Sequence, residues 1–339
     1  MIPNPHDALF KGVLGKPEHA RGVLRSVVPA ALAEALDWPT LALRPGSFVD
    51  LALKEQHTDL LYSAAWRDGG DVLVYFLFEH QSAPPKAGLM AYRLLRYQVR
   101  IWEDWHAEHP NAKTLPMIIP IVLYHGMTPW SEPRLFGDLL DVPAGVRPAV
   151  APYLIQFAYL LNDLSEISDD ELRNRAMMSA LAKLVAICFK HARTRTDFAK
   201  ILARWMDVAR EVVRAPNGLK SLAQVLCYIL EVNEHVEREA LEALLEREIG
   251  PEAKEATVTI GQQLREEGRQ EGFQQGRQEG LQQGHQRLQE VLLRLLRQRF
   301  GNEVDVHVER RVAAAPLDQL ETWTERVLSA ATLAELLAD

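Results

Sequence analysis

The stretch that decides the fold runs from residue 58 to residue 81 and reads TDLLYSAAWRDGGDVLVYFLFEHQ. Both halves are rich in the apolar and aromatic residues that strands favour, and Asp68-Gly69-Gly70 between them is typical of a tight turn. The second half is almost continuously apolar up to Glu79, which indicates a central strand covered on both faces. We therefore predict an antiparallel hairpin.

The length of the turn decides which acidic residues of the two strands lie opposite each other. If Asp68-Gly69-Gly70 is a three-residue loop, Asp59 lies directly opposite Glu79, and a loop of another length breaks that alignment. Opposed residues share a face, with Cβ atoms about 5 Å apart, and Gln81 lies on the same face as Glu79. Two carboxylates this close share a proton or hold a cation, and Mg²⁺ suits such a pair. The alternative interpretation is structural, with Asp59 capping a strand and Glu79 paired with an arginine.

The flanking sequence predicts the rest of an α/β domain. Residues 5 to about 45 have the pattern of short helices, the last over residues 30–36, and a strand is expected over residues 47–53. A helix is predicted for residues 86–109 and a further buried strand for residues 115–124. Three strands, a helix and another strand imply a mixed sheet with helices on its faces.

The helix over residues 86–109 is predicted to be amphipathic. At 100° per residue, one arc carries Lys86, Arg93, Arg96, Tyr97 and Arg100. The opposite arc is apolar and comprises Ala87, Ala91, Leu94, Leu95, Val99, Ile101 and Trp102. The basic arc is either an ordinary solvated face or a surface for a phosphate backbone.

These segments together resemble the recombination-promoting nuclease (Rpn) family of YhgA-like transposases, within the PD-(D/E)XK nuclease superfamily. The matching segments span roughly residues 4–165 and are His6-Asp7-Ala8-Leu9-Phe10-Lys11, Ser47-Phe48-Val49-Asp50, Thr58-Asp59-Leu60-Leu61-Tyr62, Phe76-Leu77-Phe78-Glu79-His80-Gln81-Ser82, Arg93-Leu94-Leu95-Arg96-Tyr97 and the stretch from Leu115 to Gly126 with Trp130.

The resemblance implies a restriction-endonuclease-like αβββαβ core and Mg²⁺-dependent endonuclease cleavage of DNA, with a role in recombination. Asp59 and Glu79 match the catalytic metal ligands, and Gln81 stands where the wider superfamily has lysine, so it would orient the attacking water. Lys86, Arg93, Arg96 and Arg100 would bind DNA phosphates. The alternatives are a transposase-like strand-transfer enzyme and a nuclease-fold interaction protein without activity.

Three further polar features lie in the matching segments. Asp7 and Lys11 are four residues apart, so they form either an ion pair on a helix face or an auxiliary part of the site. His80 alternates away from Glu79 and Gln81 and is left out. His125 is either a structural residue or faces the substrate.

Composition limits the class of protein. The 339 residues are 47% hydrophobic, carry a net charge of −8 and include two cysteines, Cys188 and Cys227. No apolar run is long enough to cross a membrane and no secretory leader is visible, so we expect a cytoplasmic protein with buried free thiols. The acidic balance argues against an abundant nucleic-acid coat protein but not against an enzyme with local basic residues.

The second half of the chain is predicted to be helical. We divide the chain into a core (1–165), a helical extension (166–250), a segment rich in Gly, Gln, Glu and Arg (251–286) and a C-terminal helical interaction segment (287–339). Glycine recurs every fourth residue from Gly268 to Gly284, as in a flexible tether or a helix that a partner backbone approaches closely. Five apolar residues within residues 291–296 favour the second reading, and hence a homo-oligomer.

Overall fold

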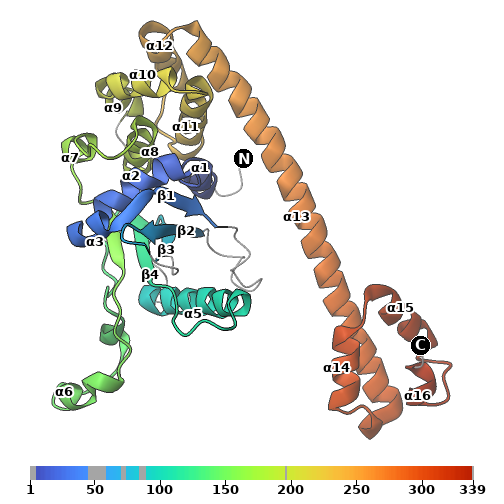
Figure 1. Cartoon of the computed structure of the whole chain (residues 1–339). Coiled ribbons are helices and arrows are strands. Elements are labelled where there is room, and N and C mark those ends of the chain that lie inside the picture. Colours follow the sequence, from blue (N-terminus) through green and yellow to red (C-terminus); the bar gives the residue numbers. More distant parts are fainter. Residues whose placement is uncertain (1–4, 45–58, 70–73, 84–88, 195–196, 338–339) are drawn as a thin grey trace. The chain divides into compact units, whose positions relative to one another are not determined.

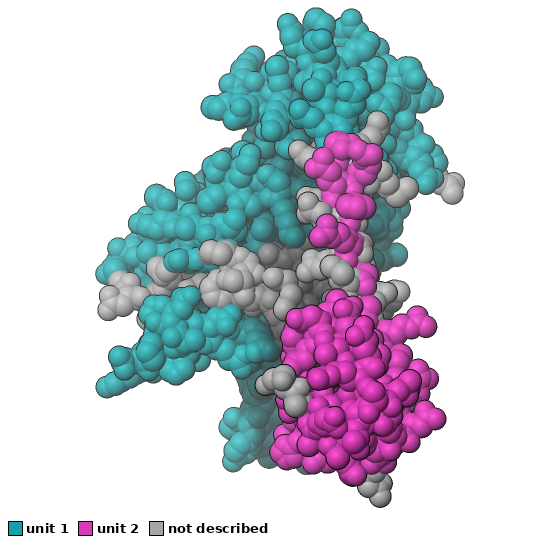
Figure 2. All heavy atoms as spheres, turned by 90° about the vertical axis from the view of Figure 1, so that its right-hand side faces the viewer, with its two compact units in different colours: residues 1–265 teal, residues 266–339 magenta. Residues whose placement is uncertain are grey.

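The computed structural model describes residues 5–44, 59–69, 74–83, 89–194 and 197–337. The chain divides into two compact units, residues 1–265 and 266–339, which are coloured teal and magenta in Figure 2. The boundary falls inside one long helix, α13 (Pro251–Phe300). Within the described residues, no helix has the length and apolar character that a membrane span requires.

The first unit is built on a five-stranded mixed sheet (Figure 1). Its strands lie in chain order and are β1 (Leu36–Leu43), β2 (Asp59–Trp66), β3 (Val74–Gln81), β4 (Ile118–Tyr124) and β5 (Leu160–Asp163). The first three are antiparallel, whereas β3, β4 and β5 are parallel. Parallel neighbours need a crossover, and helix α5 (Met90–Glu108) supplies it between β3 and β4. The predicted hairpin, crossover helix and following strand are therefore confirmed.

The edge strand β1 corrects the prediction of helices up to about residue 45. The short helix α3 (Ala30–Ala35) ends where the strand begins, and the strand pairs with β2 through Leu36 and Leu43. Pro39 cannot donate to a ladder, but an edge strand tolerates it, and the register shifts between Asp37 and Ala42 around it. The strand expected over residues 47–53 lies outside the described residues. The short strand β5 was not predicted.

The two faces of the sheet belong to different hydrophobic clusters. Tyr62, Phe76 and Ile121 lie in the larger cluster with side chains of α1 (Pro5–Leu14), α2 (Pro17–Val27) and α8 (Ala180–His191). Val122 and Tyr124 lie in the other cluster, with side chains of α5. Successive strand residues point to opposite faces, so neighbouring residues such as Ile121 and Val122 contribute to different clusters.

The helical extension packs on the α1 side of the sheet. It consists of α7 (Asp169–Arg173), α8, α9 (Phe198–Arg204), α10 (Met206–Arg214), α11 (Gly218–Val232) and α12 (Arg238–Glu248). Between β4 and β5 the chain also forms the short helices η2 (Phe136–Leu139), α6 (Arg147–Val150) and η3 (Ala151–Tyr153). The apolar residues of the helical extension belong to the larger cluster, so the extension and the sheet share one core. Cys188 and Cys227 are buried free thiols, as predicted.

The glycine tract belongs to one continuous helix in the structure. Helix α13 runs through the tract without a break, in agreement with the helical interpretation. The helix continues into η4 (Gly301–Glu303), α14 (Val306–Ala314), α15 (Leu317–Arg326) and α16 (Leu333–Leu336). Leu292 and Leu296 are fully buried in a core that includes Trp323. The apolar run that favoured an oligomer is therefore covered by helices of its own chain, and that argument for association is wrong.

Candidate functional site

The candidate site is centred on the facing strands β2 and β3. Asp59 is the direct partner of Glu79, and the register continues without a shift to Ala64 opposite Val74. Gly69 in the connecting turn has a φ of 77°, a left-handed conformation that glycine adopts without strain. The register predicted from the three-residue loop is confirmed, so Asp59 and Glu79 occupy positions on one face of the sheet.

The parallel strand β4 shows which face this is. Glu79 pairs with Val122 and Gln81 with Tyr124, and both β4 residues belong to the cluster beneath α5. The three positions therefore lie on the α5 face. Gln81 is buried and its Nε2 donates a hydrogen bond to the His80 carbonyl oxygen, at 2.8 Å.

The donor set at these positions is suited to a hard divalent cation. Two carboxylates at directly opposed strand positions, with waters completing the shell, form a common protein site for Mg²⁺. Among the described residues, no group of three or more histidine, cysteine, aspartate or glutamate side chains is arranged to hold a metal. By residue type, the opposed Asp59 and Glu79 positions are compatible with a two-carboxylate site for a hard divalent cation, and a metal at these positions stays a prediction.

Helix α5 places part of its basic arc on the exposed side. Arg96 and Arg100 are exposed, Arg93 is half-buried, and Arg100 Nη1 lies 2.9 Å from Glu103 Oε2. Tyr97 was predicted on this arc but is only 4% exposed, whereas Val99, predicted on the apolar arc, is 42% exposed. The reason is that the buried face is centred on Leu94, Ile101 and Trp105. Lys86 lies outside the described residues.

Asp7 and Lys11 form the predicted ion pair. Their side chains are 3.4 Å apart on α1, whose apolar residues belong to the cluster on the opposite face of the sheet. Burial raises the pKa of the Asp7 carboxyl, and the charge and hydrogen bond of Lys11 oppose that rise. An auxiliary role of this pair in the site stays a prediction.

A histidine cluster lies on the face opposite to the acidic positions. His80 packs against Phe10 and Phe189 with ring centroids 5.1 and 5.2 Å away, which confirms that it alternates away from Glu79. The Nε2 atoms of His80 and His125 are 2.7 Å apart, and His125 is 3% exposed. His125 is therefore a buried structural residue, which was the first of the two interpretations given for it.

His6 and two residues of the extension complete the cluster. His6 Nδ1 lies 2.8 Å from the Tyr228 hydroxyl oxygen, and Arg193 Nη2 lies 2.9 Å from His6 Nε2. Arg193 and Tyr228 were not predicted, because no local pattern in the sequence singles them out. His6, His80 and His125 each lie in a segment that carries the family resemblance.

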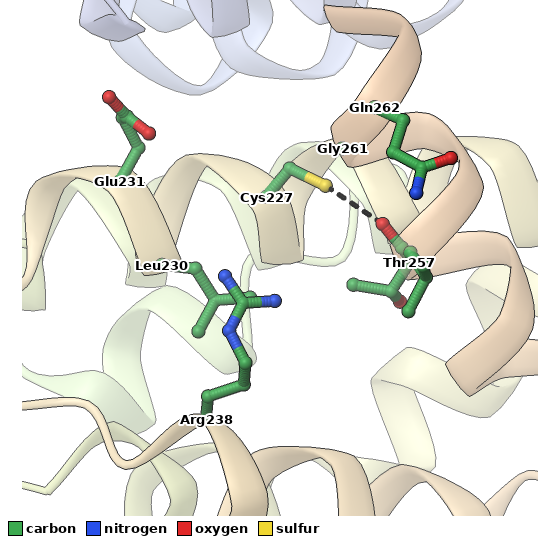
Figure 3. A pocket seen from close by; sticks show the side chains of 8 residues that line it. Cys227, Leu230, Glu231, Arg238, Thr257, Gly261 and Gln262 are labelled. Atoms are coloured by element: carbon green, nitrogen blue, oxygen red, sulfur yellow. Dashed lines mark hydrogen bonds between the residues drawn. The ribbon is translucent and has the colours of Figure 1, made fainter. Parts of the chain in front are cut away.

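A pocket elsewhere in the first unit is unrelated to these residues. It is lined by residues of α11, α12 and α13, among them Cys227, Arg238 and Thr257 (Figure 3). The Cys227 thiol lies 3.4 Å from the Thr257 carbonyl oxygen, which it faces across the helix contact. None of the predicted site residues lines this pocket.

The first unit has an α/β fold with a mixed five-stranded sheet. Its two opposed acidic positions, on the face covered by the partly basic helix α5, are a candidate metal site. The chain belongs to the family described as "Putative transposase, YhgA-like", whose model matches residues 4–220. No solved structure matches the chain.

Three curated relatives of this chain come from Escherichia coli (strain K12). Recombination-promoting nuclease RpnA is 33% identical over 270 residues, which is 78% of this chain and 85% of the relative. Recombination-promoting nuclease RpnC is 33% identical over 267 residues, or 78% of this chain and 82% of the relative. Inactive recombination-promoting nuclease-like protein RpnE is 31% identical over 303 residues, or 89% and 92%.

Proposed function

We propose that this protein is a metal-dependent DNA endonuclease with a restriction-endonuclease-like core. The observation that carries the proposal is the register that sets Asp59 opposite Glu79, with Gln81 on the same face. Two relatives that cover most of the chain are named recombination-promoting nucleases, which supports phosphodiester cleavage linked to recombination.

The roles of the site residues follow from their chemistry. Asp59 and Glu79 would hold Mg²⁺, which when bound polarises a phosphoryl oxygen and lowers the pKa of a water molecule. Gln81 would orient the attacking water through its amide. Because an amide carries no charge, it stabilises the developing negative charge less than the usual lysine would. Lys11 and Arg93 are the sequence's candidates for a substitute cation, and Arg93 is preferred because α5 covers the face that carries Glu79, whereas α1 with Lys11 packs on the opposite face.

DNA would bind across the exposed flank of α5. Arg96 and Arg100 are exposed there and Arg93 is half-buried beside them, so their guanidinium groups can contact successive phosphates. Lys86 would extend this basic surface. In the proposed division of the chain, residues 1–165 carry the chemistry and the later segments support it.

We also infer association of two copies through helix α13. The space beside Gly280 and Gly284 is open among the described residues, and Phe273 on the same helix is 71% exposed. A second copy of the helix could approach this glycine-lined side closely. Two active sites in one assembly would suit a double-strand cut.

The buried free thiols also support the expectation of a reducing, cytoplasmic setting.

A plasmid assay tests the proposal and separates it from the alternatives. The purified protein should nick or linearise supercoiled DNA with Mg²⁺ and leave it intact with a chelator. Products with newly joined ends would instead identify a strand-transfer enzyme. The inactive relative RpnE makes a protein without activity a specific alternative, and intact plasmid with every divalent cation would establish it.

A further inference from the structure

The end of strand β3 carries functional positions on one face and a histidine on the other. Glu79 and Gln81 lie on the α5 face, and His80 between them packs into the opposite face. Any contact that fixes His80 therefore also fixes the backbone from which its two neighbours project. Such support matters because catalytic groups must be held to within about 0.5 Å of their working geometry.

The first support joins the ends of β3 and β4. His80 Nε2 and His125 Nε2 share a hydrogen bond of 2.7 Å, so one of the two rings donates and the other accepts. The backbone N–H of His125 also donates to the Gln81 carbonyl oxygen at 3.1 Å. Burial is the largest cause that lowers the pKa of His125 well below its usual range, and the positive charge of Arg193 acts in the same direction, so the ring is neutral.

The second support comes from the helical extension. Arg193, which follows α8, donates from Nη1 to the Ser82 carbonyl oxygen at 3.0 Å and from Nη2 to His6 Nε2 at 2.9 Å. One guanidinium thus contacts both the chain just beyond Gln81 and the histidine of α1. A guanidinium only donates, so His6 Nε2 must be the acceptor.

That assignment fixes the tautomer of His6. With Nε2 unprotonated, the proton sits on Nδ1, which donates to the Tyr228 hydroxyl oxygen 2.8 Å away. Burial, aided by the positive charge of Arg193, lowers the pKa of His6 to about 4, in agreement with a neutral ring. Helices α1, α8 and α11 lie together on this side of the sheet (Figure 1), and α11 carries Tyr228.

We propose that Arg193 and Tyr228 are positioning residues, through which the helical extension and His6 hold the end of β3 so that Glu79 and Gln81 face Asp59. This inference rests on the proposed nuclease function. It implies that the extension contributes to catalysis by holding the end of β3 in place.

Two substitutions test this without leaving a cavity in the core, because Arg193 is exposed and Tyr228→Phe removes only a hydroxyl group. Because displacements near 1 Å can cost about a hundredfold in rate, Arg193→Ala and Tyr228→Phe should each lower kcat by about tenfold or more. The KM for DNA and its salt dependence should stay within about twofold. The matched controls are Arg214→Ala on the exposed side of α10 and Tyr153→Phe, whose side chain is 85% exposed.

Arg193→Lys separates positioning from direct contact with DNA. A lysine keeps the charge but lacks the planar fork that reaches Ser82 and His6 together, so kcat should stay low. If Arg193→Lys restores activity and Arg193→Ala mainly raises KM, Arg193 binds a phosphate and the inference is overturned. Unchanged kcat in Arg193→Ala and Tyr228→Phe would overturn it as well.

Hydrogen exchange gives a readout that needs no activity. In both Arg193→Ala and Tyr228→Phe, the amides of residues 77–82 should exchange faster, while those of α15 in the second unit should not change. Equal exchange in wild type and variants overturns the inference. If wild type cuts no DNA but exchange quickens in the variants, the support is real and the nuclease proposal alone fails.

Discussion

Asp59 on β2 lies directly opposite Glu79 on β3, with Gln81 two residues further along the same face. The pairing continues without a shift along the hairpin from these positions to Ala64 and Val74. The register therefore sets the two acidic residues at directly opposed backbone positions on one face of the sheet. A two-carboxylate metal site requires a placement of this kind.

Removing either carboxylate charge should abolish cleavage. We expect Asp59→Asn and Glu79→Gln each to lower the cleavage rate by at least about a hundredfold, because changing a residue that merely hydrogen-bonds to a metal ligand already costs up to about a hundredfold in activity. Their circular dichroism and melting temperature should match wild type. Asp68→Asn, in the exposed turn of the same hairpin, is the control and should cleave normally. Full activity in Asp59→Asn or Glu79→Gln would refute the metal-ligand assignment.

Gln81 offers a test of how the charge of the transition state is stabilised. Gln81→Lys should keep or raise the cleavage rate, because an ammonium stabilises developing negative charge better than an amide. Its ammonium can also donate to the His80 carbonyl oxygen that Gln81 now contacts. Gln81→Met, of similar size but without a donor, should be slower than wild type. A dead Gln81→Lys variant beside an active wild type would show a role that only the amide can fill.

The exposed arginines of α5 should contribute to DNA affinity through phosphate contacts. Arg96→Ala combined with Arg100→Ala should weaken binding and reduce the slope of log K against log salt by about 0.9 for each lost contact on B-DNA. The exposed Arg100–Glu103 pair adds at most about 1 kcal/mol to folding, so the fold should survive. Fluorescence anisotropy across a salt titration measures the slope. A slope equal to that of Arg214→Ala would assign these arginines to an ordinary solvated face.

Acid should destabilise the first unit through its buried histidines. The pKa of His6 falls from 6.5 to about 4 on folding, so the native state favours the neutral ring. The resulting stabilisation is complete above pH 6.5 and is lost as the pH falls towards 4. Urea unfolding at pH 7 and pH 5 should therefore show a larger drop in unfolding free energy for wild type than for His6→Asn. The exposed His106→Asn serves as control, and equal drops in wild type and His6→Asn would contradict the assignment.

Truncation tests the role of the second unit. Residues 1–265 should fold alone, because they keep the contact of Ile260 with Cys227 and lose only a unit that has its own core. If α13 joins two copies, light scattering should show a lower molar mass after the cut, and products should shift from double-strand breaks to nicks. Replacing Gly280 and Gly284 by leucine in the full chain should lower the mass in the same way. An unchanged mass in both cases would place any association elsewhere.

The sequence by itself determined the hairpin and its consequences. Asp68-Gly69-Gly70 sets the loop length, the loop sets the register, and the register pairs Asp59 with Glu79, all within about twenty residues. The amphipathic period of α5 was also visible, although its buried face is rotated enough to cover Tyr97 and expose Val99. Which side of a helix is buried depends on the surface that it meets, which the helix's own sequence does not specify.

Only the tertiary structure decided the features that depend on distant partners. The residues from Leu36 to Leu43 form a strand because β2 offers them an edge, despite Pro39. Leu292 and Leu296 are buried within their own chain, where the sequence equally allowed burial against a second copy. His6 meets Arg193 and Tyr228 across separations of 187 and 222 residues. Local propensity carries no information about such contacts, because the free energy that forms them comes from packing of the whole core.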